Sequence, residues 1–123
     1  MLARHKFRLE LFEKRYKVYD VTANFPAAIV KRANFTEEEL CTCIIGTRDA
    51  VFLYPKDIKD YLHEIRRRAL EMRLLQTRFT TLPVGEERSK LVQMQIDEIT
   101  WLSDQLTKLP DIFTPFLGFA SVK

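Results

Sequence analysis

The stretch PKDIKDYLHEIRRRALEMRLLQTRFT at residues 55–80 decides the fold class, because its apolar side chains recur at every third or fourth position. The series consists of Ile58, Leu62, Ile65, Ala69, Met72 and Phe79, with Gln76 as its one polar member. This spacing places the apolar groups on one side of an α-helix and the charged groups on the other. Pro55 suits the first turn of a helix. The sequence therefore predicts an amphipathic helix over residues 55–80.

A second amphipathic segment follows the short connection LPVG at residues 82–85. Glu86 and Glu87 suit the positive end of a helix dipole and mark the start of this helix. Its apolar positions are Val92, Ile96, Ile99, Leu102, Leu106 and Leu109. We expect Pro110 to end or bend the helix, and residues 112–119 to pack along the bundle rather than extend it. A short connection makes two such helices antiparallel neighbours.

A third long pattern precedes these two, over residues 2–33. Two adjoining apolar stripes run along it, one through Phe12 and the other through Leu11. Pro26 interrupts the pattern, because proline has no amide to bond back to Thr22. We expect either a kink at Pro26 or two helices laid end to end.

A short helix is predicted between the first and second long helices. Thr36 and Glu39 have the spacing of a capping box, in which each residue bonds the other's backbone amide. The helix should cover residues 37–45 and stop at Gly46. Residues 46–54 are expected to be irregular and to fold over one end of the bundle.

These patterns together predict an all-α fold: an antiparallel bundle of three long helices plus one short helix between the first and second long helices. The 123 residues suit one domain, so we assign residues 1–123 to a single helical-bundle domain. The composition agrees, since 46% hydrophobic and 30% charged residues are typical of a globular chain. With 3 Gly and 5 Pro there are few turns, which favours long elements.

Positive charge is concentrated at the start of the chain. Residues 1–17 hold six basic side chains against two acidic ones, a net charge of +4, whereas the whole chain carries +3. The basic side chains are Arg4, Lys6, Arg8, Lys14, Arg15 and Lys17. Such a stretch can contact an anionic surface, and residues next to a cytoplasmic membrane exit are enriched in lysine and arginine. The alternative is a solvated helix end.

Large apolar side chains gather near the C-terminus. They are Trp101, Phe113, Phe116 and Phe119. They form either part of the core or an interface with a partner, where aromatic residues are enriched.

No motif for catalysis, for a metal or for a cofactor is visible, so we assign no residue to these roles. His5 and His63 lack further ligands at zinc spacing. Cys41 and Cys43 point in different directions on a helix, and we expect two reduced thiols in a cytoplasmic protein. No apolar run reaches the roughly 20 residues of a membrane span. The arginines at 66–68 spread around their helix, so the pattern favours a solvated face there over a nucleic-acid partner.

Three stretches resemble a family of small bacterial helical proteins to which no activity is assigned. They are ELFEKRYKVYD at residues 10–20, LPVGEERSKL at 82–91 and WLSDQLTKLPDIFTPFL at 101–117. Several members carry an N-terminal membrane helix before the first of these stretches. The resemblance implies a domain on the cytoplasmic side of a membrane in longer relatives, and it implies no catalytic residue. Pro26 departs from the unbroken first helix of the family.

The leading hypothesis is a bacterial protein-interaction or scaffold domain that is not an enzyme. Its partner would be an unknown protein or a second copy of the chain, in the cytoplasm or at the cytoplasmic face of the membrane. One alternative is a membrane-proximal regulatory module that uses the basic N-terminal helix. A nucleic-acid-binding domain is the weaker alternative, and an enzyme whose site is assembled only in space would escape this reasoning.

Overall fold

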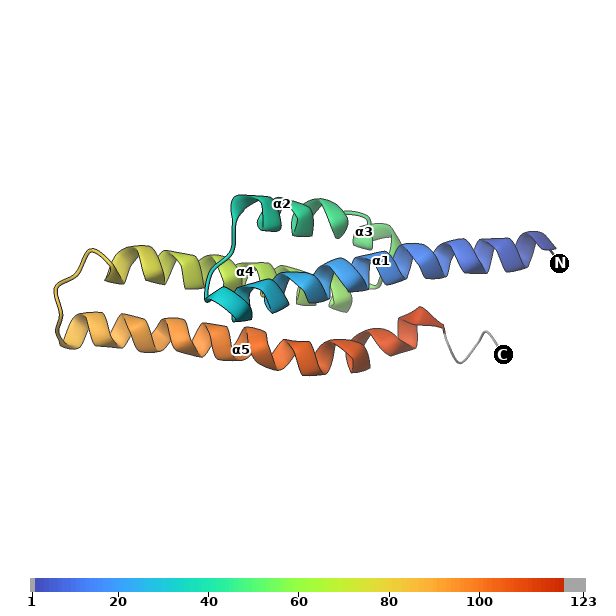
Figure 1. The fold of residues 1–123 in the computed structure, drawn as a ribbon. Helices are drawn as coiled ribbons and strands as arrows, with labels where there is room; N and C mark the ends of the chain where they lie inside the picture. Colours follow the sequence, from blue (N-terminus) through green and yellow to red (C-terminus); the bar gives the residue numbers. More distant parts are fainter. Residues whose placement is uncertain (1, 119–123) are drawn as a thin grey trace.

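The computed structural model describes residues 2–118, and every regular element in that range is an α-helix. The helices are α1 (Leu2–Arg32), α2 (Glu37–Gly46), α3 (Ala50–Leu53), α4 (Lys56–Phe79) and α5 (Glu86–Leu117). The prediction of an all-α fold is confirmed. In Figure 1, α1 and α4 run in the same direction, and α5 runs the opposite way and packs against both. The segment containing α2 and α3 returns the chain from the end of α1 to the start of α4.

α1 continues through Pro26 as one helix, which rules out the predicted alternative of two helices laid end to end. Pro26 and Ile29 are fully buried and Phe25 is 3% exposed. Their packing holds this turn of the helix although the proline donates no amide hydrogen bond. The helix terminates at Ala33, whose φ of 57° is left-handed and whose amide donates a 2.6 Å hydrogen bond to the carbonyl of Ile29.

The predicted capping box opens α2. The amide of Glu39 donates to the Thr36 hydroxyl at 3.1 Å, and the amide of Thr36 donates to the Glu39 carboxylate at 2.8 Å. The hydrogen bond from the Thr36 amide lowers the pKa of Glu39, with help from Arg32. Two orphan amides of the first turn are therefore satisfied by side chains, as the spacing predicted.

Gly46 ends α2 near the predicted position, but the structure shows a second reason for glycine there. A Cβ atom built on Gly46 would lie 2.7 Å from Cγ1 of Val21 on α1. That distance is too short for two carbon atoms, so the missing side chain is what lets α2 approach α1 closely.

The expectation that residues 46–54 are irregular is wrong, because this stretch contains α3. The amide of Tyr54 donates to the Ala50 carbonyl at 3.0 Å and closes one helical turn. Ala50 and Tyr54 are 2% and 6% exposed. A turn this short has little intrinsic stability, so burial of these side chains holds it, and the sequence pattern gave no sign of that.

α5 also continues beyond its predicted end, through Pro110 and Pro115 to Leu117. The expectation that the tail would not extend the helix is therefore wrong. Leu109, Phe113 and Leu117 are buried at intervals of four residues, so they share one face of the continued helix. Burial of this face offsets the hydrogen bonds that the two prolines cannot make.

The core lies where α1, α4 and α5 face one another, with α2 and α3 covering one side. Its main members are Val18, Phe25, Ile29, Ile58, Leu62, Ile65, Ala69, Met72, Leu102, Leu109 and Phe113. The predicted series on α4 is buried from Ile58 to Met72, and Leu75 is buried in addition. On α5 the predicted stripe is wrong in part: Gln95 and Gln105 are buried, whereas Ile96 is 47% exposed.

Candidate functional site

The basic side chains near the start of α1 divide into two groups. Arg4, Lys6, Arg8, Lys14 and Lys17 are exposed. Arg15 is half-buried, and its guanidinium donates from Nε to the Leu53 carbonyl and from Nη1 to the Phe116 carbonyl, both at 3.0 Å. Arg15 therefore joins α1 to α3 and α5, and it is not available to an anionic surface in the way that the other five are.

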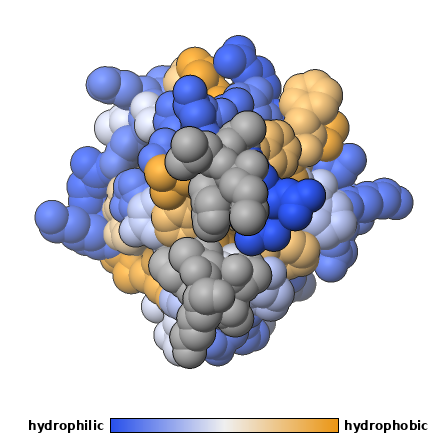
Figure 2. All heavy atoms as spheres, turned by 90° about the vertical axis from the view of Figure 1, so that its right-hand side faces the viewer, coloured by the Kyte–Doolittle hydropathy of each residue, from blue (hydrophilic) through white to orange (hydrophobic). Residues whose placement is uncertain are grey.

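The exposed basic residues of α1 do not form one positive face. With 3.6 residues per turn, Lys6 and Lys17 share a side of the helix with Glu10 and Glu13. Figure 2 views the molecule from the end where α1 begins, and there hydrophobic side chains are scattered among hydrophilic ones. Apolar and charged side chains are therefore interleaved at this end of the molecule.

The aromatic residues that were considered for an interface are distributed between core and surface. Phe113 is fully buried between Tyr19 and Tyr54, with ring centroids 5.4 and 5.3 Å away, so it belongs to the core. Phe116 is half-buried against Tyr54 at 5.6 Å. Trp101 is half-buried, and the Arg68 guanidinium covers its ring at 4.7 Å. Phe119 lies outside the described residues.

The arginines of α4 mostly hold the fold together. Arg67 and Arg68 donate to the Glu64 carboxylate at 2.6 to 3.0 Å, and these hydrogen bonds lower the pKa of Glu64 to about 2. Arg68 also donates to Glu98 on α5 at 3.3 Å. Arg73 donates to the Phe35 carbonyl at 2.8 Å and pairs with Glu37 at the start of α2. The contacts of Arg68 with Glu98 and of Arg73 with Phe35 and Glu37 join α4 to its neighbours, whereas Arg67 pairs only within α4. These three arginines are therefore engaged in ion pairs.

The part of the surface that sequence reasoning missed is a projection formed by α4 and α5. Figure 1 shows both helices extending beyond the end of α1 and the start of α2, joined by the connection at residues 80–85. Contacts between Tyr19 and Phe113 and between Arg15 and Phe116 fix the alignment of α1 with α5. Both helices rise by the same distance per residue, so counting from these contacts places the end of α1 level with about residue 100 of α5. Residues 74–96 lie beyond that level and beyond the contacts of Arg73 with Phe35 and Glu37, and they are named here the projecting hairpin.

Several apolar side chains of the projecting hairpin are uncovered. Leu74, Met94 and Ile96 are 51%, 42% and 47% exposed. Phe79, Leu82, Leu91 and Val92 are only half-buried. Two helices can bury the side chains between them but not those that face away, so a two-helix section retains apolar surface that a third or fourth helix would cover.

Two features of the described residues bear on metal binding and on thiol reactivity. Within residues 2–118 no three His, Cys, Asp or Glu side chains are grouped so that they could hold a metal ion. Burial raises the pKa of the Cys43 thiol to about 11, so little reactive thiolate is present at neutral pH. None of the helices in the described part is long and apolar enough to cross a membrane.

Comparisons of this chain with models of known protein families, with curated proteins and with solved structures found no match.

Proposed function

We propose that this chain is a protein-interaction or scaffold domain, an antiparallel bundle of three long helices without chemistry of its own, and that it associates with a second copy through the projecting hairpin. The observation that carries this proposal is the uncovered apolar surface at residues 74–96. A two-helix section of this kind gains stability when another pair of helices packs on it.

A second copy is a suitable occupant because the hairpin can complement itself. Two antiparallel helix pairs related by a twofold axis form a four-helix bundle in which each copy buries the same side chains. The charge of the hairpin does not oppose this arrangement. Its basic residues are Arg78, Arg88 and Lys90. The negative charges of Glu86 and Glu87 offset two of these positive charges. Like-charge repulsion between two copies would therefore be small.

Light scattering across a concentration series tests the proposal. The unmodified chain is expected to show twice the mass of 14.6 kDa at higher concentrations. Ile96→Glu should shift the equilibrium to the monomer, because it places a charge in the interface core. Ile45→Glu is the matched control: Ile45 is 63% exposed on α2, away from the hairpin, and its change should leave the dimer intact. A monomer at every concentration would overturn the proposal, and so would equal effects of the two variants.

The second candidate is a regulatory module at an anionic membrane surface. The observation that favours it is the N-terminal part of α1, which extends past α5 in Figure 1 and exposes Phe7 and Leu9 at 66% and 59% beside Arg4 and Arg8. Co-sedimentation with anionic vesicles at low salt tests it. Arg8→Gln should weaken the binding, and absence of binding to any anionic vesicle would exclude this function.

A further inference from the structure

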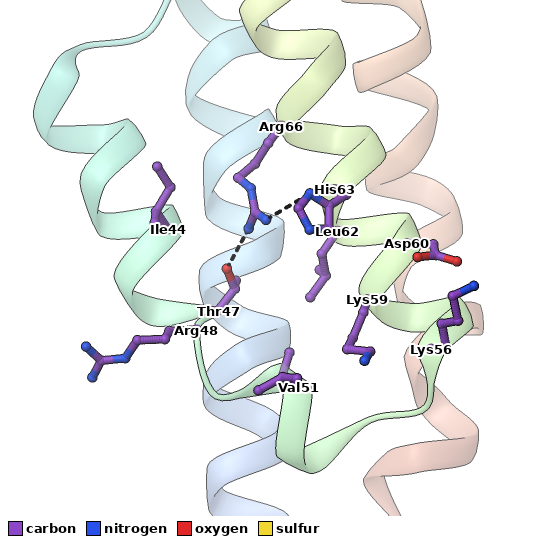
Figure 3. A pocket seen from close by; sticks show the side chains of 11 residues that line it. Ile44, Thr47, Arg48, Val51, Lys56, Lys59, Asp60, Leu62, His63 and Arg66 are labelled. Atoms are coloured by element: carbon purple, nitrogen blue, oxygen red, sulfur yellow. Dashed lines mark hydrogen bonds between the residues drawn. The ribbon is translucent and has the colours of Figure 1, made fainter.

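A pocket of about 470 Å³ lies where α2, α3 and the first turns of α4 meet, away from the projecting hairpin. Ile44 and Val51 form apolar walls on α2 and α3. Arg66 on α4 points toward Thr47, His63 lies beside the Arg66 guanidinium, and Lys59 lies one turn earlier on the same helix (Figure 3). Helices from three parts of the chain therefore bring cationic and apolar side chains around one hollow.

The lining of this pocket is strongly cationic. It contains the side chains of Arg48, Lys56, Lys59 and Arg66 and a single carboxylate, that of Asp60. In Figure 3, Arg48 extends away from the hollow, and Asp60 lies beside Lys56, on the opposite side from Arg66. Arg66 and Lys59 therefore remain near the hollow without a carboxylate beside them, and Lys56 lies at its edge.

Arg66 differs from Arg67, Arg68 and Arg73 on the same helix in having no carboxylate partner. Arg67, Arg68 and Arg73 each pair with a glutamate. Arg66 instead donates to the Thr47 hydroxyl at 3.0 Å, and its second nitrogen lies 3.4 Å from Nδ1 of His63. Among residues 2–118, no carboxylate lies within ion-pair distance of it. Because Arg66 is half-buried and held by Thr47, its guanidinium is fixed in place rather than free in solvent.

The two lysines add to this field without being paired themselves. Within the part of the chain that the structure describes, neither Lys56 nor Lys59 forms an ion pair or a side-chain hydrogen bond. Both lie in the first turn of α4, a helix of 24 residues whose dipole is positive at this end. The lysines and the partial positive charge of the helix terminus therefore favour an anionic ligand, and Asp57 in the same turn opposes them in part.

We propose that this pocket binds the phosphate group of a small organic phosphate, with Arg66, Lys59 and Lys56 as its cationic contacts. A doubly charged oxyanion suits three unpaired cations better than a single carboxylate does, and guanidinium geometry matches its oxygens. Ile44 and Val51, which are 47% and 51% exposed, contact the organic part of the ligand.

Titration of the full chain with inorganic phosphate and with phenyl phosphate, followed by amide chemical shifts at low salt, tests this site. Saturable shifts are expected in residues 44–51 and 56–66, with tighter binding of phenyl phosphate because its ring meets the apolar walls. Arg66→Gln and Lys59→Gln should each weaken binding roughly tenfold. Arg67→Gln is the matched control, since it removes the same charge from the adjacent position, and it should change the affinity less than about twofold.

Lys59→Gln separates binding from folding, because the Lys59 ammonium makes no contact that holds the fold, whereas Arg66 also bonds Thr47. Shifts spread over the whole surface, or equal weakening by Arg67→Gln and Lys59→Gln, would overturn the site. Absence of saturable binding by either probe would also overturn it.

Vesicles of phosphatidylglycerol and of phosphatidylcholine then distinguish the source of the phosphate. Binding to phosphatidylglycerol vesicles that Lys59→Gln weakens indicates that the phosphate belongs to a lipid headgroup. Binding of the soluble probes without binding to vesicles indicates a free organic phosphate.

Discussion

Arg15 and Tyr54 hold each other in position across the junction of α1 and α3. The Tyr54 hydroxyl donates a 2.7 Å hydrogen bond to the carbonyl of Arg15, and the Arg15 guanidinium lies 5.7 Å from the centre of the Tyr54 ring. The same guanidinium bonds the carbonyls of Leu53 and Phe116. One arginine therefore connects segments that are 101 positions apart in the chain, and it does so at the end of the bundle where α5 finishes.

Replacing Arg15 should destabilise the fold although the residue is charged and lies in a basic stretch. Arg15→Lys keeps the charge but loses the planar fork that reaches two carbonyls, so we expect a loss of about 1–3 kcal/mol. Urea unfolding measures it. Lys14→Gln is the control, because Lys14 is exposed and its change should stay within about 0.5 kcal/mol. Equal, small effects of both changes would show that the Arg15 contacts contribute nothing.

The helices themselves follow from local sequence. The apolar series from Ile58 to Met72 is long and regular, and all five of its positions are buried. The capping box at Thr36 and Glu39 depends on two residues three apart, so it too is readable without tertiary information. In both cases the determinant lies within one or two turns of a single helix.

What the sequence could not predict depends on contacts between distant segments. Burial of Pro26 and of the face that holds Phe113 and Leu117 keeps α1 and α5 helical through their prolines. The exposure of Ile96 arises because α1 ends one turn short of it, which no pattern within α5 records. Arg66 is singled out only by the ion pairs that its neighbours make with other residues.

Ala33→Gly should stabilise the protein. Ala33 has φ of 57°, a left-handed conformation that costs an alanine roughly 1 kcal/mol and costs glycine little. The greater freedom of glycine in the unfolded chain offsets part of this, so we expect a net gain of about 0.5 kcal/mol in the free energy of unfolding.

The control for this change is Ala27→Gly, at an exposed position within α1. There the backbone is helical, and glycine should cost about 1 kcal/mol. Thermal or urea unfolding of both variants gives the comparison. A loss of stability in Ala33→Gly equal to that in Ala27→Gly would contradict the strain at Ala33.

Gly46→Ala should destabilise the protein although alanine is the better helix former. The added Cβ would meet Cγ1 and Cγ2 of Val21 at 2.7 and 2.8 Å, so α2 must move away from α1. Overpacking of this kind typically costs 1–3 kcal/mol, which exceeds the roughly 1 kcal/mol gained in helix propensity.

A double-mutant cycle with Val21→Ala tests the cause. Val21→Ala removes the two methyl groups that the new Cβ would meet, so the pair of changes together should cost less than the sum of the separate costs. Additive costs in urea unfolding would mean that the clash with Val21 is not the origin of the effect.

The Cys43 thiol makes stability depend on pH in the alkaline range. Burial raises its pKa from 9.0 to about 11, and the residue is 4% exposed. Below pH 9 the thiol is neutral in both the folded and the unfolded chain, so its contribution is fully present. As the pH rises from 9 to 11 the unfolded chain loses the proton first, and the free energy of unfolding should fall by about 2 kcal/mol.

Burial also raises the pKa of Tyr61 to about 12, so that residue adds a further decline only above pH 10. Urea unfolding between pH 8 and pH 10 therefore isolates the cysteine. Cys43→Ala should be less stable at pH 8 but should lack the decline between pH 9 and 10, whereas Cys41→Ala, which changes the exposed thiol, should retain it. The same decline in both variants would show that another group causes it.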